Sequence, residues 1–309
     1  MNKVLIAPTT FSVYNDQPID LLKSKGFNLI MNEYGQKLSS TQLIELCRDC
    51  TGVVAGTEIY SKDIINQLSS LKVISRLGVG MDNIDLKVAR ERNIKVFKTT
   101  TTPAKAVAEL VLGLLIDVAR NISNSNKNLK IGKWKKQMGS LLQGKTLGII
   151  GLGSIGKVLV QLSSGFHFKI LAFDQHEDEL FAKENDVAYC DLETLLKNSD
   201  FVSIHLNLSD GVKYLINKDN IKLMKRSAIL INTSRGEILD EKVLYDALIS
   251  NHLAGAGLDV FEQEPYSGPL TELNNVILTP HIGSYAREIR IQMEKEATKN
   301  LIRGLNEAK

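Results

Sequence analysis

One of the five histidines stands where an apolar segment of this sequence gives way to polar residues. His281 lies in "LTPHIGS", at the end of the run "NNVILTP", and Glu264 precedes a proline in "AGAGLDVFEQEP". A carboxylate that accepts a hydrogen bond from one imidazole nitrogen fixes the tautomer of the ring and favours its protonated form. Such a pair can move one proton during a reaction near neutral pH. The spacing does not establish that the two side chains touch, and a loop histidine without a catalytic role is the alternative.

A second candidate for chemistry follows another apolar segment. Arg235 comes directly after Thr233 and Ser234 at the end of "AILIN". An arginine at the carboxyl end of a strand in an open α/β sheet faces the crevice where ligands bind. Its planar guanidinium can bind a carboxylate through two hydrogen bonds. Arg235 is therefore a candidate for holding an acidic substrate, and a surface arginine paired with Glu237 or Asp240 is the alternative.

A glycine-rich segment, "TLGIIGLGSIGKVLV", has the G-x-G-x-x-G spacing at Gly151, Gly153 and Gly156. These glycines follow an expected strand and open an expected helix, which is the context that dinucleotide binding requires. The start of such a helix presents free N–H groups to a pyrophosphate. Asp174 ends "ILAFD" about 20 residues further on, where an acid bonds a ribose of the cofactor. Neither of the next two residues is arginine or lysine, so the sequence predicts NAD rather than NADP; for Asp174, a turn residue is the alternative.

The elements that must position these residues belong to two expected α/β domains. Short β-rich runs alternate with amphipathic segments of helical length, which indicates parallel sheets. In the first hundred residues, strands are expected at 3–8, 28–33, 52–56, 72–78 and 95–99, and helices at 16–26, 39–49, 61–70 and 84–93. A long helix is expected at about 104–121. The pattern then restarts, with strands at 145–153, 168–174, 186–190, 200–208, 227–236, 254–261 and 274–282 and a last helix at 285–309.

Composition excludes several other classes of protein. The net charge of the 309 residues is only +3, and the densest basic cluster, "KNLKIGKWKK", fits a solvated helix or arm better than a nucleic-acid site. The longest apolar stretch, "AVAELVLGLLIDVA", is too short to span a bilayer, so no membrane partner is expected. Three cysteines are too few for a disulfide framework, and "CRDC" has no second pair for zinc, so no metal is expected. The N-terminus lacks the zones of a signal peptide, which predicts a cytoplasmic location.

Four segments, taken together and in order, resemble a known enzyme family. They are "GIIGLGSIGK", "INTSRGEILDEKVLYDAL", "AGAGLDVFEQEP" and "LTPHIGS". In these segments the chain resembles the D-isomer-specific 2-hydroxyacid dehydrogenases, in particular the phosphoglycerate dehydrogenase type without a regulatory domain. The resemblance implies hydride transfer between NAD(H) and a small D-2-hydroxy acid or 2-oxo acid. It also implies a Rossmann-type doubly wound NAD-binding domain at 99–286 and a flavodoxin-like α/β substrate domain formed by 1–98 and 287–309.

The resemblance assigns a role to each candidate residue. Arg235 is expected to bind and polarise the substrate, His281 to donate the proton to its carbonyl oxygen, and Glu264 to tune His281. The residues expected near the cofactor are Gly151, Gly153, Ser154, Ile155, Gly156, Asp174, His205, Thr233, Ser234, Arg235, Asp259, His281 and Gly283. Those expected near the substrate are Arg76, Val79, Gly80, Arg235 and His281. The long helix and the arm after it, Ala104–Trp134, are expected to form a homodimer, and hinges near 98–101 and 284–288 to allow domain closure.

Departures from the family pattern leave the substrate open. Phosphoglycerate dehydrogenases tend to carry an arginine where this chain has Ala55, whereas Arg76 matches a second arginine that contacts phosphate. A phosphorylated substrate is therefore one of the alternatives. Glu264 argues against formate dehydrogenase chemistry, because those enzymes have glutamine at this place. A non-catalytic NAD(H)-sensing binding protein of the same fold is the alternative from another class.

Overall fold

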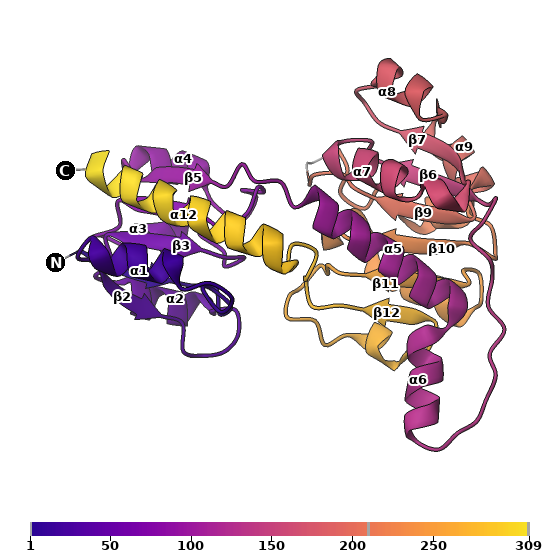
Figure 1. Cartoon of the computed structure of the whole chain (residues 1–309), viewed down its shortest axis with the longest axis horizontal. Helices are drawn as coiled ribbons and strands as arrows, with labels where there is room; N and C mark the ends of the chain where they lie inside the picture. Colours follow the sequence, from indigo (N-terminus) through magenta and orange to yellow (C-terminus); the bar gives the residue numbers. More distant parts are fainter. Residues whose placement is uncertain (1, 209–210, 308–309) are drawn as a thin grey trace. The chain divides into compact units, whose positions relative to one another are not determined.

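The computed structural model describes residues 2–208 and 211–307, which form two compact units (Figure 1). One unit contains the residues up to Thr102 together with those from Tyr285 onward, and the other is Pro103–Ser284. The predicted boundaries, 98/99 and 286/287, lie near these points, and the predicted limits 1 and 309 lie outside the described residues. Which unit binds the substrate stays a prediction.

The first unit is built on a five-stranded parallel sheet, as the alternating segments predict. Its strands are β1 (Lys3–Ile6), β2 (Asn28–Met31), β3 (Gly52–Ala55), β4 (Val73–Arg76) and β5 (Lys95–Lys98). They lie in the order β2-β1-β3-β4-β5, which is the flavodoxin-like order that the resemblance implies. The central strands β1 and β3 are buried on both faces because helices cover both sides of the sheet.

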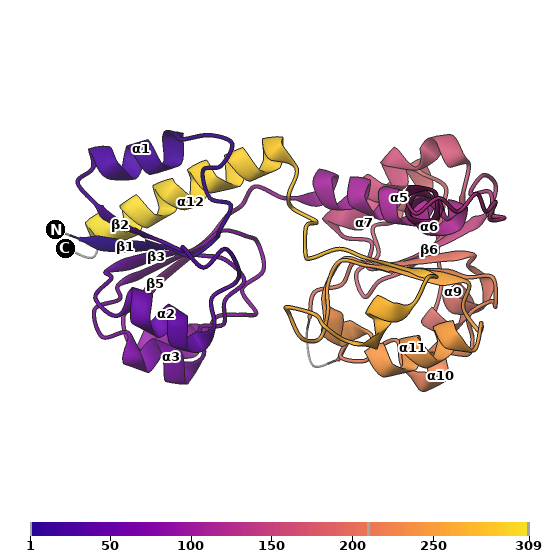
Figure 2. The same cartoon turned by 90° about the horizontal axis from the view of Figure 1, so that it is seen from below.

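Helices from both ends of the chain cover one face of this sheet. Figure 2 shows α1 (Gln17–Ser24) and α12 (Arg287–Glu307) on this face. The opposite face carries α2 (Ser40–Cys47), α3 (Lys62–Gln67) and α4 (Leu86–Glu91). Gly304 allows α12 to approach the sheet closely, because a Cβ there would lie 2.6–2.8 Å from Phe97 and Val73. The last segment of the sequence thus completes the core of the first unit.

A carboxylate on α12 holds the chain where it leaves β5. Glu296 accepts hydrogen bonds from the backbone nitrogens and the hydroxyl groups of Thr100 and Thr101, at 2.7–2.9 Å. Partial burial opposes ionisation of Glu296, but these four bonds outweigh it and lower the pKa of Glu296 to about 2. The first unit is therefore fastened at one of the segments expected to act as a hinge.

Replacing Glu296 with alanine is expected to destabilise the first unit by about 2 kcal/mol at pH 7, since charge-assisted bonds at a partly exposed site are lost. Because the pKa of Glu296 in the folded protein lies below its usual value of 4.5, this stabilisation is present above pH 4.5 and is lost as the pH falls towards 2. Urea unfolding at pH 7 and at pH 3.5 should show the difference between variant and wild type shrinking at the lower pH. Glu288→Ala, an exposed site in the first turn of α12, is the control. An equal difference at both pH values would contradict the assignment.

The second unit is built on a seven-stranded parallel sheet. Its strands are β6 (Thr146–Ile150), β7 (Lys169–Phe173), β8 (Val187–Tyr189), β9 (Phe201–Ile204), β10 (Ile229–Asn232), β11 (Gly255–Leu258) and β12 (Val276–Leu278). The strands lie in the order β12-β11-β10-β9-β6-β7-β8. Successive strands are added on one side of β6 up to β8 and, after a reversal, on the other side from β9 onward, as in a Rossmann sheet with one further strand at the edge. Ligands of such sheets bind beyond the carboxyl ends of the strands at this reversal. The predicted doubly wound fold is confirmed.

Helices cover both faces of the second sheet as well. One face carries α5 (Ala104–Arg120), α7 (Ser154–Leu162) and α8 (Glu179–Glu184), and the other α9 (Leu192–Asn198), α10 (Lys218–Ile221) and α11 (Glu241–Ile249) (Figure 2). Short 3-10 turns lie at Ser164–Phe166, Gly236–Ile238 and Pro269–Glu272. The apolar α5 packs on β10, β11 and β12, whereas α6 (Ile122–Lys130) buries none of its residues and projects from the unit (Figure 1). Within residues 2–208 and 211–307, no helix is both long and apolar enough to cross a membrane.

Candidate active site

The structure brings His281 and Glu264 into contact. The Nδ1 of His281 lies 2.9 and 3.0 Å from the two carboxylate oxygens of Glu264. Because an ionised carboxylate only accepts hydrogen bonds, Nδ1 carries the proton and donates a hydrogen bond to Glu264. The His281 side chain is 35% exposed, so the ring remains accessible to a ligand. This is the geometry of an oriented histidine that can give or take a proton at its other ring nitrogen, Nε2.

Asp259 shapes the loop that carries His281. This carboxylate, at the end of β11, is almost fully buried and accepts bonds from the hydroxyl of Thr279 and the backbone nitrogens of Ile282 and Gly283, at 2.6–2.8 Å. Burial raises the pKa of Asp259, while the hydrogen bonds and the neighbouring His281 favour its ionised form. The three bonds hold both sides of His281, whose backbone has a left-handed φ of 55°. Asp259 therefore orients the loop, and its expected contact with the nicotinamide stays a prediction.

Arg235 sits on a turn organised by a buried amide. Asn232 is the last residue of β10. Its side-chain oxygen accepts hydrogen bonds from the backbone nitrogen and the hydroxyl of Ser234, and its side-chain nitrogen donates one to the backbone oxygen of Arg235, at 2.9–3.1 Å. The guanidinium itself donates from Nη1 to the oxygen of Ser234 at 2.7 Å. Arg235 is partly buried, at the carboxyl end of a central strand. This position agrees with ligand binding better than with the alternative of a surface arginine.

The glycine-rich segment has the geometry of a pyrophosphate cradle. Gly151 has a φ of 96°, and a Cβ there would lie 3.0 Å from the His205 carbonyl group. A Cβ on Gly156 would lie 2.6 Å from the Gly151 oxygen, so both positions require glycine. Gly153 faces open space and precedes α7 without a side-chain cap. The first N–H groups of α7, those of Ser154 and the two residues after it, are thus able to bind an anion.

Asp174 follows β7 and bonds to the same segment. One of its oxygens accepts from the nitrogen of Leu152 at 2.7 Å, and the other from the nitrogen of His176 at 2.9 Å. The carboxylate therefore lies beside the glycine-rich turn, where an acid can meet the adenosine ribose of a dinucleotide. Its negative charge opposes a 2′-phosphate at this place.

Two buried polar atoms at adjacent strand ends fit a bound cofactor. Nδ1 of His205 and Oγ1 of Thr233 are buried and have no hydrogen-bond partner among residues 2–208 and 211–307. The preceding residues, Ile204 and Asn232, are opposite each other in β9 and β10. Burial lowers the pKa of His205 to about 3, so this ring stays neutral at physiological pH. Buried polar atoms normally find a partner, and a dinucleotide at the sheet reversal would supply one.

In the first unit, Arg76 is bound within its own loop. Its Nη1 donates to the carbonyl oxygen of Leu77, and a Cβ on Gly78 would lie within 2.9 Å of three guanidinium atoms. Burial raises the pKa of Glu58, while the charge of Arg76 favours its ionised form. The guanidinium therefore supports the loop after β4, while the backbone nitrogen of Gly56 donates to the Glu58 carboxylate at 2.8 Å.

Apolar side chains are exposed in the loops that follow the first four strands of this unit. They are Val13, Tyr14, Tyr34, Ile59 and Val79. Val79, at 39% exposure, and Gly80 lie in the loop after β4, where the carboxyl ends of parallel strands meet. Their expected contact with the substrate stays a prediction.

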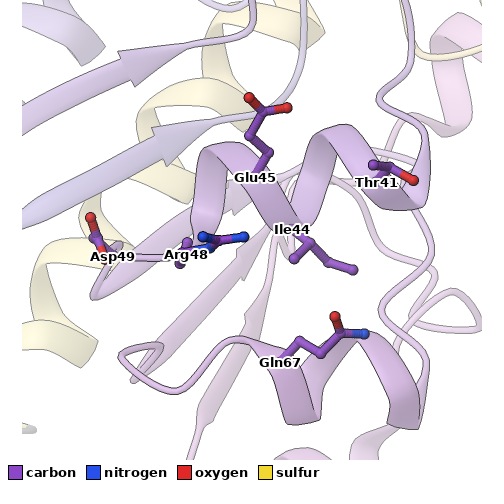
Figure 3. A pocket seen from close by; sticks show the side chains of 6 residues that line it. All are labelled: Thr41, Ile44, Glu45, Arg48, Asp49 and Gln67. Atoms are coloured by element: carbon purple, nitrogen blue, oxygen red, sulfur yellow. The ribbon is translucent and has the colours of Figure 1, made fainter.

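A polar hollow between α2 and α3 lies away from these strand ends (Figure 3). It is lined by Thr41, Ile44, Glu45, Arg48, Asp49 and Gln67. Asp49 pairs with Lys3, and the amide of Gln67 donates to the backbone oxygen of Asp63. Two of the polar groups that line the hollow are therefore used locally.

Sequence reasoning missed two residues that shape the site. Asn232 and Thr279 hold the turns that carry Arg235 and His281. The signal for Asn232 was its place as a polar amide at the end of the otherwise apolar "AILIN". Thr279 gave no such signal, because its partner Asp259 is distant in sequence.

Comparisons with known proteins agree with this geometry. The model of the family "D-isomer specific 2-hydroxyacid dehydrogenase, NAD binding domain" matches residues 112–283. A hydroxypyruvate reductase of Thermotoga maritima is 37% identical over 308 residues, which cover 96% of this chain and 98% of that protein. A glyoxylate reductase of Thermococcus litoralis is 41% identical over 271 residues, covering 84% and 82%. The crystal structure of the TT0316 protein from Thermus thermophilus superposes with a TM-score of 0.88 at 33% identity, covering 98% and 97% of the two chains.

Proposed function

The chain belongs to the D-isomer specific 2-hydroxyacid dehydrogenases and is an NAD-dependent oxidoreductase, and we propose that it reduces small 2-oxo acids without a phosphate, such as hydroxypyruvate and glyoxylate. The observation that carries the proposal is the contact between His281 and Glu264 on a sheet that also carries Arg235 at a strand end. Relatives named hydroxypyruvate and glyoxylate reductase support the substrate class.

The chain's own residues would bind the acid and move one proton. NADH, when bound, supplies the hydride. Arg235 would hold the substrate carboxylate with its guanidinium fork and polarise the 2-oxo group. His281 would donate the proton from Nε2 to the carbonyl oxygen, while Nδ1 stays bonded to Glu264. Glu264 would stabilise the imidazolium in the reverse reaction, when His281 takes the proton back.

The proposal of an unphosphorylated substrate depends on residues of the first unit. Ala55 supplies no charge, and Nη1 of Arg76 already donates to the backbone oxygen of Leu77. The neighbouring strand-end loops expose apolar side chains, which do not compensate two phosphate charges. A compact uncharged substituent on the 2-oxo acid suits this edge better.

NADH oxidation should be measured with hydroxypyruvate, glyoxylate, pyruvate, 3-phosphohydroxypyruvate and a branched 2-oxo acid. We expect kcat/KM for hydroxypyruvate or glyoxylate to exceed that for the phosphorylated acid by about 100-fold. Highest turnover with 3-phosphohydroxypyruvate would overturn the assigned substrate class. Tight NADH binding without turnover of any 2-oxo acid would instead favour the NAD(H)-sensing alternative.

Replacing Asp174 with alanine is expected to reduce the preference for NADH over NADPH by about 10- to 100-fold, because a charged hydrogen-bond acceptor for the ribose is lost. Dissociation constants for both cofactors, measured by fluorescence, would show the change. Glu177→Ala removes an exposed carboxylate three residues further on and should leave the ratio unchanged. A wild-type protein that already prefers NADPH would refute this role of Asp174.

We propose that the chain forms a homodimer through the Ala104–Trp134 region. The helix α6 buries none of its residues, and Ile131, Trp134 and Met138 are exposed in the segment after it. Such apolar side chains gain stability when a second copy covers them. Sedimentation equilibrium should give twice 34.2 kDa for the wild type and a monomer for Trp134→Lys, with exposed Leu180→Lys as the control. A cytoplasmic location and the lack of a nucleic-acid partner stay predictions.

A further inference from the structure

Two loops of the second unit carry the groups assigned to chemistry, and their backbones are in direct contact. Arg235 lies on the turn between β10 and α11, and Glu264 on the loop after β11. Gly236, next to Arg235, lies so close to the other loop that a Cβ there would overlap the carbonyl group of Phe261 and the nitrogen of Glu262. The contact requires glycine at this position. A displacement of one loop is therefore transmitted to the other.

A pair of glutamates joins the same two loops in a reciprocal way. The nitrogen of Glu262 donates to Oε1 of Glu241 at 2.6 Å, and the nitrogen of Glu241 donates to Oε1 of Glu262 at 3.2 Å. The second oxygen of Glu262 accepts from the hydroxyl of Tyr214 at 2.9 Å. Each carboxylate thus holds the backbone of the other loop.

The place of Glu241 in the fold explains why a carboxylate binds there. Glu241 is the first residue of α11, and the side chain of Asp240 caps this helix through the nitrogen of Val243. The nitrogen of Glu241 is one of the N–H groups that a helix leaves without an internal partner at its start. Glu262 supplies that partner from another segment of the chain, and the helix dipole favours its negative charge.

The arrangement persists against electrostatic repulsion. Burial raises the pKa of Glu241, and the like charges of Glu262, Glu237 and Glu264 raise it further. A contact between two carboxylates is unfavourable unless backbone donors satisfy both of them. Here the donors are the backbone nitrogens of Glu241 and Glu262, which belong to the two segments that the contact joins.

We propose that Glu241 and Glu262 are positioning residues that fix the Arg235 turn relative to the Glu264 loop, and through Glu264 relative to His281. This inference rests on the proposed function, because the turn and loop matter for catalysis only if Arg235 and His281 act on one substrate. The pair touches neither substrate nor cofactor in this assignment. It sets the separation between the carboxylate-binding group and the proton donor.

The test is the full-length Glu241→Ala enzyme. Displacements of about 1 Å in reacting groups typically cost about 100-fold, so we expect kcat to fall by about 10- to 100-fold. The dissociation constant for NADH should stay within about twofold, since the glycine-rich segment is untouched. Glu241→Gln should restore most of kcat, because its amide oxygen can still accept from the nitrogen of Glu262.

Controls separate positioning from general damage. Glu179 is the first residue of α8 and follows an aspartate cap, as Glu241 does in α11, but it is exposed. Glu179→Ala should therefore leave kcat unchanged. The double variant Glu241→Ala/Glu262→Ala should lose more activity than either single variant, because each single variant keeps one of the two reciprocal bonds and the double variant loses both. A kcat for Glu241→Ala near that of the wild type, with intact melting behaviour, would overturn the proposal.

Hydrogen exchange makes the result independent of the substrate assignment. In the cofactor-free protein, amides of 233–241 and 259–264 should exchange faster in Glu241→Ala than in the wild type, and not in Glu179→Ala. If the wild type reduces no 2-oxo acid, the proposed function fails. Faster exchange would still support the positioning role of Glu241 and Glu262. Unchanged exchange in Glu241→Ala would overturn the positioning role of Glu241 and Glu262, whatever the kcat of the variant.

Discussion

Replacing His281 with asparagine is expected to lower kcat by about 10²- to 10⁴-fold, the usual contribution of a general acid–base group. The Nδ1 of His281 is held by Glu264 at 2.9–3.0 Å, so Nε2 is the nitrogen that can give a proton to a substrate. Asparagine cannot donate that proton. It does accept the left-handed backbone at this position, with its φ of 55°, more readily than alanine does. The lost activity would therefore report on the proton and not on a rearranged loop.

Two measurements accompany the His281 variant. The dissociation constant for NADH should stay within about twofold of the wild type, because the expected pyrophosphate contacts lie at the start of α7. His176→Asn, an exposed histidine of the same unit, should retain full kcat. A His281→Asn enzyme within tenfold of the wild type would remove His281 from the role of proton donor.

The fold could be predicted because its signals are local. Every expected strand and helix is present in the described residues, with ends shifted by a few positions. For example, the strand expected over "KVLIAP", residues 3–8, is observed at Lys3–Ile6. Strands buried on both faces are continuous apolar runs, and Ser39, Ser61 and Asp85 mark helix starts through their hydrogen bonds to the first turn. The order of the strands, in contrast, came with the family resemblance. Local patterns do not specify which strand pairs with which.

The contacts within the site could not be derived in the same way. Glu264 and His281 lie on different loops, and only the pairing of β11 with β12 brings them together. The carboxylate of Asp259 holds the loop around His281, a contact that the sequence did not reveal, and its expected contact with the nicotinamide stays a prediction. The backbone donors it binds cannot be recognised from residue types. Arg76 illustrates the same limit, because its bond to the neighbouring Leu77 oxygen depends on how the loop folds back.

Replacing Arg235 with lysine is expected to lower kcat/KM for a 2-oxo acid by about 100-fold or more. Lysine keeps the positive charge but loses the planar fork that binds a carboxylate through two bonds. The turn itself should persist, because Asn232 donates to the backbone oxygen of residue 235 and not to its side chain. Arg226→Lys, at an exposed arginine of the same unit, should leave kcat/KM unchanged.

A substrate without the carboxylate isolates what Arg235 contributes. With a 2-oxo amide such as pyruvamide, the wild type should lose most of its advantage over Arg235→Lys, because neither enzyme has a carboxylate to bind in two-point geometry. The two enzymes should then differ by less than about tenfold, against about 100-fold with pyruvate. An equal penalty with both substrates would mean that Arg235 acts on the carbonyl group or on the loop, and that another group holds the acid.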